Sequence, residues 1–145
     1  MELTSQAFER NGKIPSRYTC QGNNTNPPLE WAEVPEGTKS FALIIDDPDA
    51  VPVAGFTWIH WLVKDIPAST LKIYENSVLG TQLKNSFGRE AYGGPCPPDG
   101  KHRYFFKLYA LDVEKLQAST SKEVYEQVEA HKIEKAVLMG TYVKQ

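Results

Sequence analysis

The sequence predicts a mainly β protein with one helix packed against its side. Two observations support this fold class. Short apolar runs are separated by segments rich in glycine, proline, asparagine and aspartate, and these residues are typical of the turns and loops that connect strands. Only one segment of the chain has the spacing of an amphipathic helix. The 145 residues contain no internal repeat and no long linker, so we expect a single domain spanning residues 1–145.

The strongest strand candidate is the run of five apolar residues at 41–45. It is too short for a helix and is bounded by turn formers, which is typical of a central strand covered on both faces. The remaining strand candidates share an apolar or alternating pattern, with the last two weaker than the others: 57–66, 103–112, 136–144, 3–8 and 76–82.

The one predicted helix covers residues 120–131. Thr120 is followed three residues later by Glu123, a pattern that satisfies free backbone amides at a helix start. Val124 and Val128 then lie on one face at helical spacing, which predicts that this face packs on the sheet.

Composition excludes several classes of protein. Hydrophobic residues make up 41% and charged residues 23% of the chain, and the net charge is −2. A nucleic-acid-binding protein usually carries a basic stripe, which is missing here. No apolar run reaches the roughly 18 residues of a membrane span, and the N-terminus lacks the pattern of a signal peptide. We therefore expect a cytoplasmic protein with no nucleic-acid partner and no membrane span.

Two cysteines, Cys20 and Cys96, lie far apart in the sequence and lack the paired spacing of a metal site. Two unlinked thiols in a reducing cytosol are the favoured interpretation. A disulfide that joins two loops is the alternative, because bridging depends on a Cα separation that sequence does not reveal.

Two of the three histidines stand in apolar strand patterns. Strand residues two apart point to the same face, which groups His60 with Leu62 and His102 with Tyr104. A buried imidazole without a partner costs about 1–3 kcal/mol, so each ring needs a hydrogen bond. Either histidine alone is more typical of a structural role than of a functional one.

An acidic loop follows the most buried strand and carries Asp46, Asp47 and Asp49. Pro48 restricts its own φ and pushes Asp47 toward an extended conformation. A rigid acidic loop beside two inward-facing histidines would form a small polar pocket in an apolar surround, which is the usual composition of a small-ligand site.

Several motifs strongly resemble the phosphatidylethanolamine-binding protein family, which includes the Raf kinase inhibitor proteins and small bacterial and archaeal members. They are "NNTNPPLEW", "IDDPDAV", "WIHWLV" and "GPCPPDGKHRYFFKLYALD", in the family's order, and the resemblance runs from about residue 10 to residue 143. It implies a β-sandwich with a large central sheet, a smaller sheet and one or two peripheral helices.

The resemblance also implies a ligand-binding site. Its residues, carried over motif by motif, are Asp47, Asp49, His60, Gly94, Pro95, His102 and Tyr104. This chain departs from the common family pattern in having Val51 after "DPDA", Ile59 before the strand histidine and Cys96 in the pocket loop.

The function implied is binding of a small anion or phosphate group, such as a phospholipid head group, without turnover and without a cofactor. An imidazolium donates two hydrogen bonds and a nearby carboxylate favours that charged form, so we expect affinity to strengthen as pH falls. The family resemblance adds regulation of kinase or protease signalling through a protein partner. A homodimer is a further candidate assembly.

Three alternatives stay open. A metal-dependent enzyme could use Asp47, His60 and His102, since two histidines and a carboxylate can form a facial triad. Hydrolysis could proceed through Cys96 or a serine activated by His102, although no G-x-S-x-G stretch occurs. Action through a partner could use exposed aromatic residues within 31–35 or 53–58.

Overall fold

The structure is a computed structural model that describes residues 1–145. The strands are β1 (Glu2–Thr4), β2 (Leu29–Ala32), β3 (Ser40–Asp47), β4 (Trp58–Pro67), β5 (Lys72–Ile73), β6 (Thr81–Gln82), β7 (Lys101–Leu111) and β8 (Lys132–Val143). The helices are α1 (Val51–Ala54) and α2 (Ser121–His131), with short 3₁₀ turns η1 (Ser16–Tyr18) and η2 (Pro48–Ala50).

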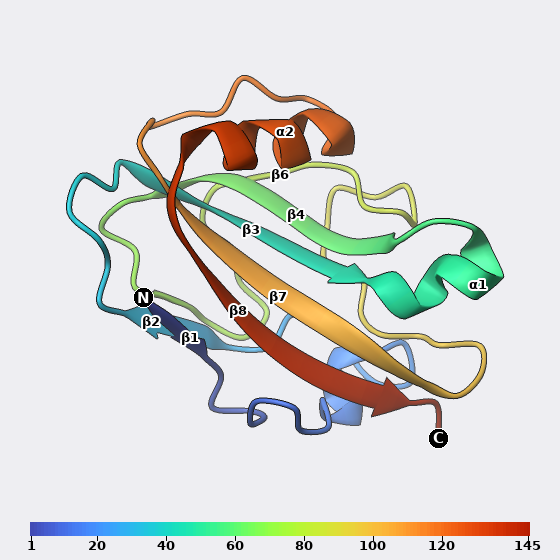
Figure 1. The fold of residues 1–145 in the computed structure, drawn as a ribbon. Coiled ribbons are helices and arrows are strands. Elements are labelled where there is room, and N and C mark those ends of the chain that lie inside the picture. Colours follow the sequence, from blue (N-terminus) through green and yellow to red (C-terminus); the bar gives the residue numbers. More distant parts are fainter.

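These elements form two sheets and a helix in three layers (Figure 1). The large sheet has the order β6-β4-β3-β7-β8 and the small sheet the order β1-β2-β5. Helix α2 covers one face of the large sheet, while the small sheet lies against the other. The predicted β-sandwich with a large sheet, a smaller sheet and peripheral helices is therefore confirmed.

Strand β3 lies at the centre of the large sheet, and all eight of its residues are buried. It pairs antiparallel with β4 on one edge and with β7 on the other. Its alternate residues enter two different cores: Leu43 packs between the two sheets, and Ile44 packs under α2. The apolar run at 41–45 is thus a strand covered on both faces, as predicted.

Helix α2 begins as the capping pattern predicts. The Thr120 hydroxyl accepts a hydrogen bond from the Glu123 amide at 3.2 Å. Val124 and Val128 are buried against the large sheet. Strand β8 follows the helix directly at Lys132, four residues before the run at 136–144 that predicts it.

The small sheet and the edge strand β6 of the large sheet were predicted less well. Of the segment 3–8, only its first two residues lie in β1, and of 76–82 only its last two lie in β6. Strands β2 and β5 were not predicted. These strands contain two to four residues, which is too short for an alternating pattern to develop.

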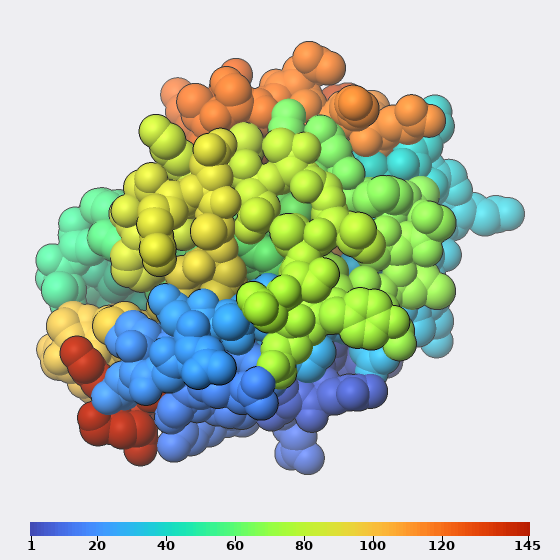
Figure 2. Space-filling view, turned by 180° about the vertical axis from the view of Figure 1, so that it is seen from behind, coloured from blue at the N-terminus to red at the C-terminus, as the bar shows by residue number.

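A disulfide joins Cys20 to Cys96, with Cα atoms 5.5 Å apart. The preference for two unlinked thiols was therefore wrong, because folding brings two loops together that sequence spacing could not relate. Figure 2 shows the segment around Cys20 (blue) and residues 84–100 (yellow) side by side on the rear of the molecule. Disulfides persist best in oxidising surroundings, so a cytoplasmic location stays a prediction.

None of the helices has the length and apolar character that a transmembrane helix requires.

The disulfide closes a loop with a sequence separation of 76, so we expect it to stabilise the fold by restricting the unfolded chain. Replacing Cys20 and Cys96 together by alanine should lower the free energy of unfolding by about 2–5 kcal/mol in urea denaturation. Added reductant should destabilise the wild type by a similar amount and leave the double variant unchanged. If the wild type unfolds at the same urea concentration with and without reductant, this expectation is wrong.

Candidate functional site

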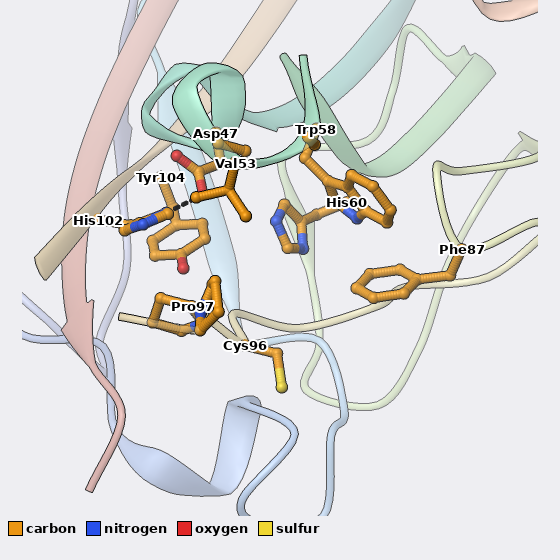
Figure 3. Close-up of a pocket in the computed structure, with 12 residues that line it drawn as sticks. Asp47, Val53, Trp58, His60, Phe87, Cys96, Pro97, His102 and Tyr104 are labelled. Atoms are coloured by element: carbon orange, nitrogen blue, oxygen red, sulfur yellow. Dashed lines mark hydrogen bonds and ion pairs between the residues drawn. The ribbon is translucent and has the colours of Figure 1, made fainter. Parts of the chain in front are cut away.

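The antiparallel order of the large sheet brings three chain segments to one place. Strand β3 ends at Asp47, where β4 begins near His60 and β7 begins near His102. A cavity of about 260 Å³ opens there, beside α1 (Figure 3). Its lining residues are Asp47, Ala50, Val53, Ala54, Trp58, His60, Phe87, Cys96, Pro97, Pro98, His102 and Tyr104.

Asp47 and His102 form a buried pair at one end of the cavity. The His102 Nδ1 atom lies 2.6 Å from Asp47 Oδ2, and the other carboxylate oxygen accepts the Asp49 amide at 2.8 Å. Burial raises the pKa of Asp47, and the hydrogen bond and charge of His102 act against that rise. The second nitrogen of His102 faces the exposed Asp99 at 3.9 Å.

The position of His60 depends on a β-bulge. Ile45 pairs with Trp61 and the next residue, Asp46, pairs with Ile59, so His60 is the extra residue on β4. Alternation predicts that His60 and Leu62 share a face, and this was wrong. The bulge turns Trp61 toward the core between the sheets and Leu62 toward α2.

The His60 ring is held by the loop that walls the cavity. Its Nδ1 atom lies 2.6 Å from the Gly93 carbonyl oxygen. A carbonyl only accepts hydrogen bonds, so Nδ1 carries the proton. Burial lowers the pKa of His60 to about 4, while the nearby backbone carbonyls act in the opposite direction. The ring is therefore neutral near pH 7.

Two buried hydrogen-bond donors in the cavity wall have no partner within the protein. They are the Tyr104 hydroxyl and the Trp58 indole nitrogen. In Figure 3 the Tyr104 hydroxyl extends into the space above Pro97. Burial raises the pKa of Tyr104, so its hydroxyl keeps its proton. Buried donors are nearly always satisfied, and leaving one unpaired costs about 1–3 kcal/mol.

Aromatic side chains pack around His60 in the cavity wall. The His60 ring packs edge-on against Tyr104 at 5.2 Å and against Phe87 at 5.6 Å between ring centres. Phe87 also packs edge-on against Trp58 at 5.3 Å. Sequence reasoning missed Phe87, because a loop aromatic gives no positional signal. Trp58 could have been predicted, because it stands two residues before His60 in the same strand pattern and strand alternation places both on one face.

Of the seven residues predicted for the site, four line the cavity and three lie outside the lining. Asp49 instead pairs with Arg103, whose Nη2 atom lies 2.8 Å away. The Gly94 amide donates to the Asn24 side chain at 2.8 Å, and a side chain at Gly94 would collide with the loop around Tyr18.

Pro95 also supports a wall of the cavity rather than its lining. Its carbonyl accepts the Cys20 amide at 3.1 Å, next to the disulfide.

The predicted acidic loop is divided between the two faces of the sheet. Asp46 points toward α2, where its Oδ2 atom accepts from Lys107 Nζ at 2.8 Å and from the Tyr125 hydroxyl at 2.6 Å. The expectation that Asp46, Asp47 and Asp49 emerge together was wrong, because β3 continues to Asp47 and its side chains alternate.

The geometry argues against a metal site and against Cys96 as a nucleophile. No group of three or more histidine, cysteine, aspartate or glutamate side chains is placed to hold a metal ion. The sulfur of Cys96 is bonded to Cys20 and offers no thiolate for nucleophilic attack.

Comparison with known proteins gives a consistent result. The model of the phosphatidylethanolamine-binding protein family matches residues 4–143. A UPF0098 protein of Methanothermobacter thermautotrophicus is 46% identical, and the alignment covers 98% of each chain.

Two solved structures are also similar. The phosphatidylethanolamine-binding protein homologue CT736 of Chlamydia trachomatis superposes with a TM-score of 0.91 at 41% identity, covering 99% of this chain and 97% of the other. Escherichia coli YBCL, a member of the same family, has a TM-score of 0.91 at 33% identity, covering 99% and 98%.

The neutral state of His60 links its burial to stability. The unfolded chain takes up a proton at His60 near pH 6.5, but the folded chain does so only near pH 4. The stability that this difference contributes is present above pH 6.5 and is lost as pH falls toward 4. Between pH 7 and pH 4 the free energy of unfolding of the wild type should fall by about 3 kcal/mol more than that of His60→Gln, as measured by urea denaturation at each pH.

The matched control is the exposed histidine at the end of α2. His131→Gln tests the effect of removing a histidine in general, because His131 lies near the surface beside Asp112 and outside the cavity. A constant difference between wild type and His60→Gln across this range would contradict the assignment of a neutral buried ring.

Proposed function

Because the chain belongs to the phosphatidylethanolamine-binding protein family, we propose that it binds a small phosphate-bearing or anionic ligand without catalysing its conversion. The ligand occupies the cavity between α1 and the ends of β3, β4 and β7. The single observation that carries this proposal is the pair of buried, unpartnered donors on Tyr104 and Trp58, because an oxyanion supplies the acceptors that they lack.

The size of the cavity supports a small ligand. Its volume of about 260 Å³ lies just below the usual range for drug-sized ligand sites. A phosphate group with a short substituent fits such a space. The wall formed by Val53, Pro97 and Phe87 is apolar and would contact the substituent.

The charge of the site sets its affinity. No lysine or arginine lines the cavity, so the only cation available to a bound anion is the imidazolium of His102. The carboxylate of Asp47 repels an anion unless it is protonated or compensated by His102. Protonation of either group favours binding, and affinity should therefore be modest and should strengthen as pH falls.

A protein partner is a second candidate ligand, in line with regulation of kinase or protease signalling. Its basis is an exposed apolar edge beside the cavity, where Val53 is 57% and Phe56 is 51% exposed. Segment 53–58 thus offers an exposed apolar surface for a partner. In the other suggested segment, 31–35, the aromatic residue Trp31 is buried. The same edge would serve a homodimer.

Titration of the protein with inorganic phosphate and with phosphoethanolamine, followed by NMR of the imidazole resonances, tests the main proposal. We expect shifts in the His60 and His102 signals, with affinity rising from pH 8 to pH 5. Tyr104→Phe should weaken binding about tenfold or more, since it removes one hydrogen bond to a charged group. Tyr125→Phe is the matched control, because that hydroxyl binds Asp46 on the opposite face of the sheet.

Absence of binding at millimolar phosphate across this pH range would refute the proposal. A Tyr104→Phe variant with wild-type affinity would refute the role of the unpartnered hydroxyl.

A further inference from the structure

The hydrogen-bonding pattern of His60 gives the cavity one acceptor. Its Nδ1 proton points to the Gly93 carbonyl oxygen at 2.6 Å. In Figure 3 one ring nitrogen faces the loop that contains this carbonyl, and the other faces the cavity between Asp47 and Tyr104. In a neutral ring that second nitrogen, Nε2, carries a lone pair and no proton, so it accepts hydrogen bonds and cannot donate them.

The surroundings keep the His60 ring neutral. It is 3% exposed and is enclosed by aromatic side chains from β7 and from the loop at 84–100. The charge of Asp46 favours its protonation, and the charge of His102 opposes it. Tyr104 faces it from β7 as a neutral phenol, and α1 contributes no charged side chain to the cavity. Burial outweighs these effects.

The other polar atoms of the cavity have complementary roles. The Tyr104 hydroxyl and the Trp58 indole nitrogen are free donors. Both carboxylate oxygens of Asp47 already accept hydrogen bonds from within the protein. A ligand that satisfies the cavity therefore needs acceptors for two donors and also a donor for His60 Nε2.

We propose that the cavity selects an oxyacid group that retains one proton, namely a phosphate monoester in its monoanionic form, and that His60 Nε2 accepts the hydrogen bond from its P–OH group. Trp58 and Tyr104 donate to the remaining oxygens. This inference rests on the proposed function and adds the protonation state of the ligand. A sulfate monoester has the same shape and charge but no proton to donate, so it leaves His60 Nε2 facing an oxygen lone pair.

Methyl phosphate and methyl sulfate form a matched pair of probes for isothermal titration calorimetry. At pH 5 both carry one negative charge, because the second pKa of a phosphate monoester is about 6. We expect methyl phosphate to bind at least about tenfold more tightly, since methyl sulfate leaves a buried acceptor unsatisfied. Between pH 6 and pH 8 the ratio of the two affinities should fall as methyl phosphate loses its proton.

The ratio of the two affinities at pH 5 does not depend on effects that act equally on both probes. The charges of Asp47 and His102 change the affinity for the two monoanions alike, so they cancel. Equal affinities at pH 5 would overturn this inference and leave the proposed function standing. Failure of both probes to bind at any pH would overturn this inference and the proposed function together.

Two variants assign the selectivity to a residue. His60→Phe keeps an aromatic ring but removes Nε2, and the ratio of affinities should fall to about one. Tyr104→Phe should weaken both probes and keep the ratio, because its hydroxyl donates to either ligand. If His60→Phe folds and keeps the wild-type ratio of affinities, the role assigned to His60 is wrong. If it does not fold, the ratio measured for the wild type still tests the proposal.

Discussion

The antiparallel pairing of β3 with β4 and β7 is the constraint on which the cavity depends. Because β3 runs opposite to both neighbours, its end at Asp47 meets the beginnings of β4 and β7, which carry His60 and His102. The strand is buried on both faces, so its register cannot slip without moving apolar side chains into solvent. The central strand thus fixes the placement of groups that are far apart in the chain.

The β-bulge on β4 places His60 in the wall of the cavity. A regular strand would place His60 and Trp61 on opposite faces, and only one of them could enter the space between the sheets. The extra residue lets Trp61 pack in the core while His60 reaches the cavity. The resulting site is largely neutral and aromatic, with its charge confined to the Asp47–His102 pair.

The loops complete the cavity from outside the sheet. The segment 84–100 supplies Phe87 and Pro97, and its carbonyl at Gly93 orients His60. The disulfide at Cys96 and the close approach at Gly94 attach this segment to the loop around Tyr18. Gly94, which lies outside the lining, thereby helps to fix the position of this wall.

Sequence patterns alone determined the long strands, helix α2 and four residues that line the cavity. Apolar runs and a capping box arise from local preferences, so they can be read without tertiary contacts. Family motifs identified Asp47, His60, His102 and Tyr104, all of which line the cavity. Only the tertiary structure decided the short strands, the bulge at His60, the disulfide, the division of the acidic residues between two faces and the contribution of Phe87. Each of these depends on pairing register or on contacts between distant segments, and neither quantity is encoded in local spacing.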